Sequence, residues 1–250
     1  MLKVDEIFKR GLTFVDGAGF HPEGKLLVNN KSSLLNSISR SIKFFCDDVV
    51  GASQLNFIPE LATKIPYREC WFEFLFPQGD RSGFLAITTD NGVLFFSFFW
   101  SAENTKCGWG FFGSFFIRDN GAISYAKAPC SAEDFIIETS PLFSFISALN
   151  CKNVILESRA PNQKAQRLRA SLRKPPLFSY HTLVLDIERS AAKSDHLGGT
   201  HSSPRVHLRR GHPRQYAPEK WTWVQPCAVG NKSKGIVHKD YAVLFERGRT

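Results

Sequence analysis

The sequence predicts an α+β protein with a mixed or mainly antiparallel sheet and few helices. From Glu69 onward, short aromatic and β-branched runs alternate with turn sequences, two of which are Asp-Asn-Gly, at 90–92 and 119–121. Two long segments, by contrast, carry the apolar spacing of helices. The chain has 250 residues, of which 43% are hydrophobic and 22% charged. These values are typical of a globular protein that buries a proper core, and we expect one domain over 1–250.

The first half of the chain predicts two helices on either side of a strand meander. The first helix begins at a cap, Ser32 or Ser33, and its apolar spacing continues to Val49. The five runs at 69–77, 83–90, 93–101, 109–119 and 122–128 are predicted antiparallel strands. The second helix covers 131–149 with Ser131 as its cap, and Pro141 interrupts it, so that two shorter helices are an alternative.

The second half predicts strands around one short basic helix. Strands are expected at 152–158 and 178–188, with the helix between Pro161 and Pro175. Residues 189–203 lack periodic apolar residues and predict a flexible loop. A β-rich module over 204–246 follows, with strand candidates at 205–210, 220–230 and 235–246. Within it, 206–208 and 221–224 are expected to pair antiparallel, with a polar connection between them.

The charge is unevenly distributed along the chain. The formal net charge is +9, but residues 1–158 carry −3 and residues 159–250 carry +12. Such an asymmetry indicates an anionic partner: nucleic acid, an acidic protein face or, less often, a membrane surface.

Several classes of protein are disfavoured by what the sequence lacks. No apolar run reaches the ~18 residues that a transmembrane helix needs, and the first residues have no signal-peptide core, so we expect a cytoplasmic protein without membrane contact. The six cysteines are scattered without a Cys-x-x-Cys pair, which favours free thiols over a zinc site. Phosphate-binding Gly-rich motifs, paired metal ligands and nucleophile elbows are also missing, so no cofactor and no metal are expected.

The stretch 205–227 concentrates basic and aromatic residues. On a strand, Arg205, His207 and Arg209 would share one face, and Trp221 and Trp223 would share one face of the returning strand. Arginines would neutralise phosphates and the indoles would stack on the bases of a single strand. The predicted nucleic-acid contacts are Arg205, His207, Arg209, Arg210, His212, Arg214, Trp221 and Trp223, helped by Lys164, Arg167, Arg169 and Arg173 of the basic helix.

Other interpretations of this stretch stay open. The tryptophans could fill a core, and the histidines could bond to backbone groups. A metal-independent ribonuclease would use His207 and His212 as acid and base, with Arg209 and Lys239 stabilising the phosphorane. A third possibility is a protein–protein module without nucleic-acid contact. We expect a binding protein rather than an enzyme, because the histidines come without a nucleophile or a metal motif.

Three blocks of the sequence resemble a broad set of phage and prophage proteins. The C-terminal block, 205–243, has the pattern Arg-x-His-x-Arg-Arg-Gly-His, a polar turn, then Trp-Val-x-Pro-x-x-Val-Gly. The other blocks are "KIPYRECWFEF" at 64–74 and "RKPPLFSYHTLVLD" at 173–186. One branch of that set is an anti-CRISPR family directed against a type V-A effector nuclease.

The resemblance implies a phage-borne protein that interferes with host nucleic-acid or defence machinery. Its expected partner is a nucleic acid or a ribonucleoprotein, with a host protein as the alternative. The turn "PRQYAPEK" at 213–220 has its own sequence here, so the choice of partner could differ from that of the set.

Overall fold

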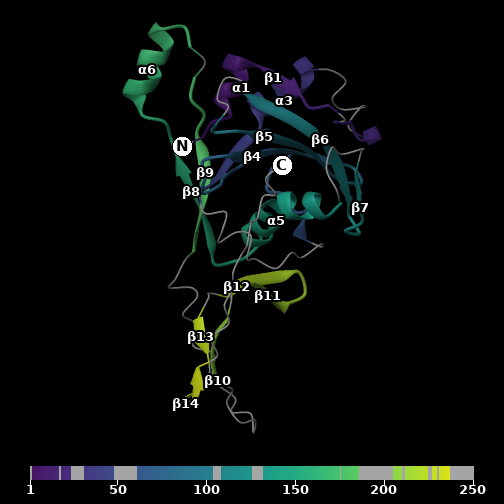
Figure 1. Cartoon of the computed structure of the whole chain (residues 1–250), viewed down its shortest axis with the longest axis vertical. Helices are drawn as coiled ribbons and strands as arrows, with labels where there is room; N and C mark the ends of the chain where they lie inside the picture. Colours follow the sequence, from purple (N-terminus) through teal and green to yellow (C-terminus); the bar gives the residue numbers. More distant parts are fainter. Residues whose placement is uncertain are drawn as a thin grey trace.

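The computed structural model is shown in Figure 1 and confirms the α+β class. It describes residues 2–16, 18–23, 31–47, 61–103, 108–125, 132–174, 176–185, 205–209, 212–224, 227–229 and 231–236. For 132–137, 185, 205–209, 227–229 and 231–236 the description is limited to the backbone. The predicted loop at 189–203 and the strand candidate beyond residue 236 lie outside the described residues.

The helices and strands follow one another in a mixed order. In chain order they are α1 (Asp5–Arg10), β1 (Leu12–Phe14), α3 (Lys31–Arg40), β2 (Ile42–Cys46), β3 (Glu69–Leu75), β4 (Arg81–Thr89), β5 (Gly92–Trp100), β6 (Trp109–Arg118), β7 (Ile123–Tyr125), α5 (Ala132–Leu149), β8 (Val154–Arg159), α6 (Gln163–Ser171), β9 (Tyr180–Leu185), β10 (Arg205–Arg209), β11 (His212–Ala217), β12 (Lys220–Val224), β13 (Cys227–Val229) and β14 (Asn231–Ile236).

The main sheet has nine strands in the order β1-β6-β5-β4-β3-β2-β9-β8, with β7 paired to β6. The predicted meander forms its antiparallel centre, β3 to β6, and the turn at 90–92 joins β4 to β5. Parallel pairs join β1 to β6 and β2 to both β3 and β9, so the sheet is mixed. The strands near the C-terminus form two small separate sheets, β13-β10-β14 and β11-β12.

Helices cover both faces of the main sheet (Figure 1). On one face, Leu34 and Ile38 of α3 join the cluster that contains Trp71 and Trp109. On the other face, α5 packs Phe143, among others, against the phenylalanines of the sheet. Burial on both faces explains why the central strands are nearly continuous apolar runs.

Many of the phenylalanines, of which the sequence has 23, contact other aromatic rings. Phe95 and Phe115 stack across neighbouring strands with centroids 4.9 Å apart, and Phe44 and Phe72 do so at 5.1 Å. Such aromatic pairs add to the stabilisation that comes from buried area. Glycine at position 83 leaves room for the Trp71 indole, because a Cβ atom there would lie 2.5 Å from that ring.

A buried carboxylate fixes the first residues of the chain to the sheet. Glu73 on β3 is fully buried and pairs with Arg81 on β4 at 2.5 Å. The same carboxylate accepts hydrogen bonds from the backbone N–H groups of Lys3 (2.6 Å) and Val4 (3.0 Å) and from the Trp71 indole (3.3 Å). Glu73 therefore neutralises a buried cation and satisfies two backbone donors ahead of α1.

The N-terminal segment also contacts β6. Leu12 on β1 lies opposite Trp109 on β6, and the Trp109 indole N–H donates to the carbonyl of Lys3 at 3.0 Å.

A buried lysine closes the C-terminal end of α3. The Nζ atom of Lys43 donates to the carbonyls of Ile38 (2.6 Å), Ser39 (2.9 Å) and Ser41 (2.6 Å). It also lies 4.3 Å from the centroid of the Phe178 ring. A cation at this end of a helix satisfies carbonyls that lack intrahelical partners. Burial nevertheless lowers the pKa of Lys43 to about 8.

Two predictions about individual elements were wrong. The first predicted helix ends at Arg40, and residues 42–46 form strand β2. Phe44 and Phe45 are both buried, and a short apolar run of this kind fits a buried strand as well as a helix. The expected pairing of 206–208 with 221–224 does not occur, because residues 212–217, taken as a connection, form β11 and pair with β12. Strand β10 pairs with β13 and β14 instead.

Helix α5 continues through Pro141 without a break in its span, Ala132–Leu149. Of the two alternatives, the single helix is therefore the one that forms.

Candidate nucleic-acid interface

Helix α6 is the predicted basic helix, and its start is set by one side chain. Asn162 is the N-cap, and its carboxamide oxygen accepts from the N–H groups of Lys164 (2.8 Å) and Ala165 (3.3 Å). Leu172 caps the other end, and Arg173 adopts a positive φ of 51°. This left-handed residue turns the chain away from the helix axis.

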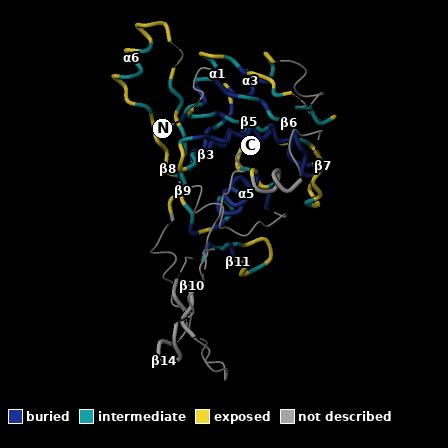
Figure 2. The backbone as a smooth tube through the Cα atoms, viewed as in Figure 1, coloured by how far each residue is buried: buried dark blue, intermediate teal, exposed yellow. Residues whose placement is uncertain are grey.

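The outward face of α6 is cationic. Lys164, Arg167 and Ser171 are exposed and follow one another at i, i+3 and i+7, so they share one side of the helix. Arg173 and Lys174 are exposed just beyond its end. Residues 159–174 contain no acidic residue, and within the described part of the chain the ion pairs of α6 are limited to that of Arg169. Figure 2 shows how much of this region is exposed to solvent.

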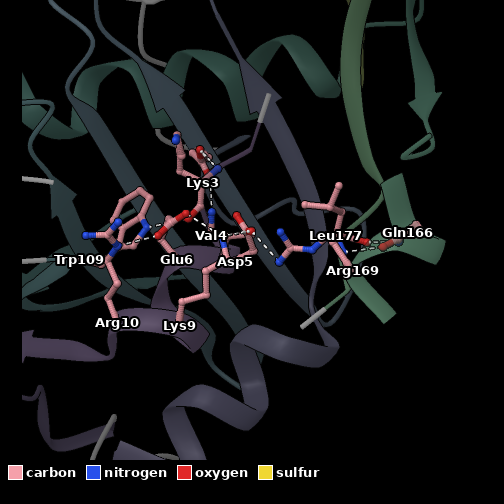
Figure 3. Close-up of polar contacts among 11 residues, drawn as sticks. Lys3, Val4, Asp5, Glu6, Lys9, Arg10, Trp109, Gln166, Arg169 and Leu177 are labelled. Carbon is pink, nitrogen blue, oxygen red and sulfur yellow. Dashed lines mark hydrogen bonds and ion pairs between the residues drawn. The ribbon is translucent and has the colours of Figure 1, made fainter. Parts of the chain in front are cut away.

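Arg169 faces the body of the protein and ties α6 to α1. Its guanidinium lies 3.3 Å from the carboxylate of Asp5, and both side chains are mostly buried (Figure 3). Gln166 fixes the returning chain, because its amide donates to the Leu177 carbonyl at 2.7 Å and accepts from the Leu177 N–H at 2.9 Å. Arg169 is thus a residue that positions the helix, not one of its exposed cations.

Around Asp5, helix α1 carries a small charge network (Figure 3). Lys9 contacts Asp5 at 2.8 Å and Glu6 at 2.6 Å, and Arg10 contacts Glu6 at 2.9 Å. Burial acts to raise the pKa of Glu6, but the bonds from Lys9 and Arg10 outweigh it and hold that pKa below its ordinary value. Asp5, the partner of Arg169, therefore belongs to a helix whose acidic and basic side chains pair with one another.

The β11–β12 hairpin holds the second group of predicted contacts. His212 and Arg214 lie opposite Val224 and Thr222, whereas Pro213 lies opposite Trp223. Because side chains alternate along a strand, His212 and Arg214 share the face that points away from the tryptophans. Arg214 is exposed.

An exposed aromatic residue of this hairpin is already in contact with a cation. Tyr216 is 48% exposed, and the Lys152 Nζ atom lies 4.2 Å from its ring centroid. Glu219, with a φ of 57°, forms the turn of the hairpin and pairs with Lys64.

Trp223 is too buried to be a base-stacking platform of the kind predicted. Trp223 is 7% exposed and packs in a small cluster with Ala148 and Cys151, against which Trp221 also lies. Asn153 holds this strand in place, because its amide donates to the Trp223 carbonyl at 2.8 Å and its oxygen accepts from the Trp223 N–H at 2.6 Å. These indoles attach the hairpin to α5 and β8, and a nucleobase has no access to the ring of Trp223.

For the other predicted contact and catalytic residues near the C-terminus, the structure describes the backbone alone or nothing. Arg205, His207 and Arg209 lie on β10, of which the backbone alone is described, and Arg210 and Lys239 lie outside the described residues. His207 and His212 belong to different sheets, since β10 pairs with β13 and β14 while β11 pairs with β12.

The two basic groups lie far apart. Helix α6 and the β13-β10-β14 sheet are near opposite ends of the longest axis of the molecule (Figure 1). The helix and the β10 residues therefore do not form one continuous surface.

Sequence reasoning missed several residues of this region. Lys174 belongs to the same acid-free stretch as Lys164, so the composition of that stretch could have revealed it. Asp5 and Lys152 gave no signal, because their contacts with Arg169 and Tyr216 join distant parts of the chain.

Comparisons with models of known families, with curated proteins and with solved structures find no match to this chain. The resemblance of the three sequence blocks to phage proteins stays a prediction. Within the described residues, no cluster of His, Cys, Asp or Glu has the arrangement of a metal site. The helices of the same part of the chain all lack the combination of length and apolarity needed to span a membrane.

Proposed function

We propose that this chain is a phage- or prophage-encoded cytoplasmic protein that binds a nucleic acid or a ribonucleoprotein and so interferes with host nucleic-acid or defence machinery. The observation that carries the proposal is the outward face of α6. Lys164, Arg167, Arg173 and Lys174 are exposed on a segment without acidic residues, beside a body whose first 158 residues have a net charge of −3. Clustered cations of this kind supply the sequence-independent part of nucleic-acid affinity.

The host-defence part of the proposal rests on the resemblance of the three sequence blocks. The basic character of 159–250 is compatible with that resemblance, because a nucleic acid and a ribonucleoprotein both present phosphates.

A salt titration tests the binding. Fluorescence anisotropy at 50 and 200 mM salt would use RNA, single-stranded DNA and duplex DNA. Phosphate contacts make log affinity fall with log salt by about 0.9 per contact on a duplex. The double variant Lys164→Gln/Arg167→Gln should therefore reduce the slope by roughly 1.8.

The chain offers a matched control for this variant. Arg68 and Arg118 are exposed on the body, so Arg68→Gln/Arg118→Gln removes the same charge at a different place. An equal loss in both variants would mean that net charge, not α6, sets the affinity. If the wild-type chain binds none of the three nucleic acids at 50 mM salt, the nucleic-acid proposal is wrong and a protein partner takes its place.

The ribonuclease alternative has its own test. Incubating the chain with labelled RNA in EDTA should leave the RNA intact if the protein is a binder. Cleavage that His207→Ala or His212→Ala abolishes, in variants that keep the fold, would establish the enzyme instead, since a general acid or base carries ~10² to 10⁴-fold in rate.

A further inference from the structure

Two amide side chains of this region, those of Asn162 and Gln166, are already used within the protein. Asparagine and glutamine amides recognise adenine edges. The Asn162 oxygen caps the helix, and the Gln166 amide bonds at both ends to the backbone of Leu177. The side chains that α6 exposes to solvent include two long cations, Lys164 and Arg167, with Ser171 one turn further along and Gln163 at the start of the helix.

The segment that carries these cations supplies no aromatic platform of its own. Residues 159–174 contain no aromatic residue, and the indole of Trp223 is buried beneath the hairpin. Proteins that hold single strands combine a cationic groove with aromatic rings on which bases stack. A duplex needs no such platform, because its bases are already stacked and its phosphates lie outermost.

The dimensions of α6 fit a groove of B-form DNA. An α-helix with its side chains is about 10–12 Å across. The major groove of B-DNA is ~12 Å wide and admits a helix, whereas that of A-form RNA is too narrow for side chains to read. Helix α6 stands clear of the main sheet (Figure 1), and the tie between Arg169 and Asp5 holds its cationic face outward.

We infer that the ligand of α6 is the phosphate backbone of a nucleic-acid duplex, above all B-form DNA, bound without regard to sequence. The inference rests on the proposed function and narrows it: Lys164, Arg167, Arg173 and Lys174 contact phosphates, while Arg169 positions the helix. It replaces the stacking of single-stranded bases that the tryptophans suggested.

A competition experiment tests the choice of ligand. Two unrelated 24-base-pair DNA duplexes, a duplex RNA of equal length and a single-stranded DNA with the same number of phosphates would compete for the full chain. We expect the dissociation constants of the two DNA duplexes to agree within about twofold. Both should bind more tightly than the duplex RNA and the single-stranded DNA. Raising salt from 50 to 200 mM should weaken the wild type roughly 12-fold more than Lys164→Gln/Arg167→Gln, since a slope difference of about 1.8 acts over a fourfold change.

Two control variants test whether residues other than the cations of α6 contribute to binding. Leu168→Gln removes a leucine that is 60% exposed on α6 without changing its charge, and Tyr216→Ala removes the exposed ring of the hairpin. Both should bind duplex DNA as the wild type does, with melting curves showing that every variant is folded.

Three results would overturn the inference. The first is tighter binding of the single strand than of the duplexes, and the second is a loss on Tyr216→Ala without a loss on Lys164→Gln/Arg167→Gln. The third is a loss on Leu168→Gln as large as that on the double variant, which would indicate an apolar protein groove as the partner of α6. If none of the competitors binds, the proposed function itself is wrong. The three results above, by contrast, overturn the further inference alone.

Discussion

Replacing Glu73 by glutamine is expected to destabilise the fold far more than the loss of an exposed carboxylate does. Glutamine keeps the shape of the side chain but removes its charge and turns one oxygen into an N–H donor. Both oxygens of Glu73 accept from donors, Lys3 N–H and Arg81 on one and Val4 N–H and the Trp71 indole on the other. In either orientation of the new carboxamide, its NH2 group replaces an oxygen that accepts two hydrogen bonds. Three donors then meet there with no acceptor between them.

The magnitude follows from the burial of the pair. The Glu73 side chain is 0% exposed and that of Arg81 is 8% exposed, so the guanidinium would stay buried without its counter-charge. Breaking a buried ion pair by removing one partner costs about 3–5 kcal/mol. An exposed pair provides the contrast: Arg159 and Glu157 lie 2.7 Å apart with side chains 56% and 45% exposed, and such pairs contribute ~0–1 kcal/mol.

Urea denaturation followed by tryptophan fluorescence measures both variants on the same scale. Glu73→Gln should lower the free energy of unfolding by ~3–5 kcal/mol, and Glu157→Gln by less than ~1 kcal/mol. If the two substitutions cost the same, Glu73 does not organise a buried polar cluster and the reasoning is refuted.

Three further predictions concern the tie of α6 and buried titratable groups. Arg169→Gln should lower duplex affinity yet leave its salt slope unchanged, because Arg169 bonds to Asp5 and not to phosphate; a slope that falls by about one would make it a contact. The pKa of Lys43 is about 8 in the folded chain and 10.5 without the effect of burial. Between pH 8 and pH 10.5 the unfolded chain therefore binds more protons than the folded chain does. The stability of the wild type relative to Lys43→Met should therefore rise between pH 8 and 10.5, by up to ~3 kcal/mol in denaturation curves, and a flat difference would contradict the burial of a charged amine. Burial raises the pKa of Cys70 and of Cys151 to about 12, so mass spectrometry after iodoacetamide treatment at pH 8 should find both unmodified in the native chain and modified in denaturant.

The parts of the fold that the sequence predicted are those with local signals. The β3–β6 meander is recognisable from turn sequences between aromatic runs, and α5 from its cap and length. Strand β2 was mistaken for the end of a helix because Phe44 and Phe45 both face protein, which removes the alternation that marks a half-exposed strand. Helix α1 is six residues long, too short for a periodic signal.

The candidate site divides in the same way. Local composition was enough to find the cations Lys164 and Arg167, which are exposed on α6. The burial of Trp223 depends on Asn153 and on the end of α5, and the role of Arg169 depends on Asp5. These contacts join residues tens to more than a hundred positions apart, which no local pattern encodes.

The fixation of the N-terminal segment sets an order for folding during synthesis. The carboxylate that holds Lys3 and Val4 is supplied 70 and 69 residues later, and the indole that bonds to the Lys3 carbonyl 106 residues later. The segment before α1 leaves the ribosome before those partners exist, and closing such long loops is slow compared with forming a hairpin. The β3–β6 meander can assemble from neighbouring segments, and α1 with β1 docks onto it only once β6 has been made. The segment of α1 and β1, although it is made before the meander, is thus among the last to reach its native place, and its aromatic partners remain uncovered until then.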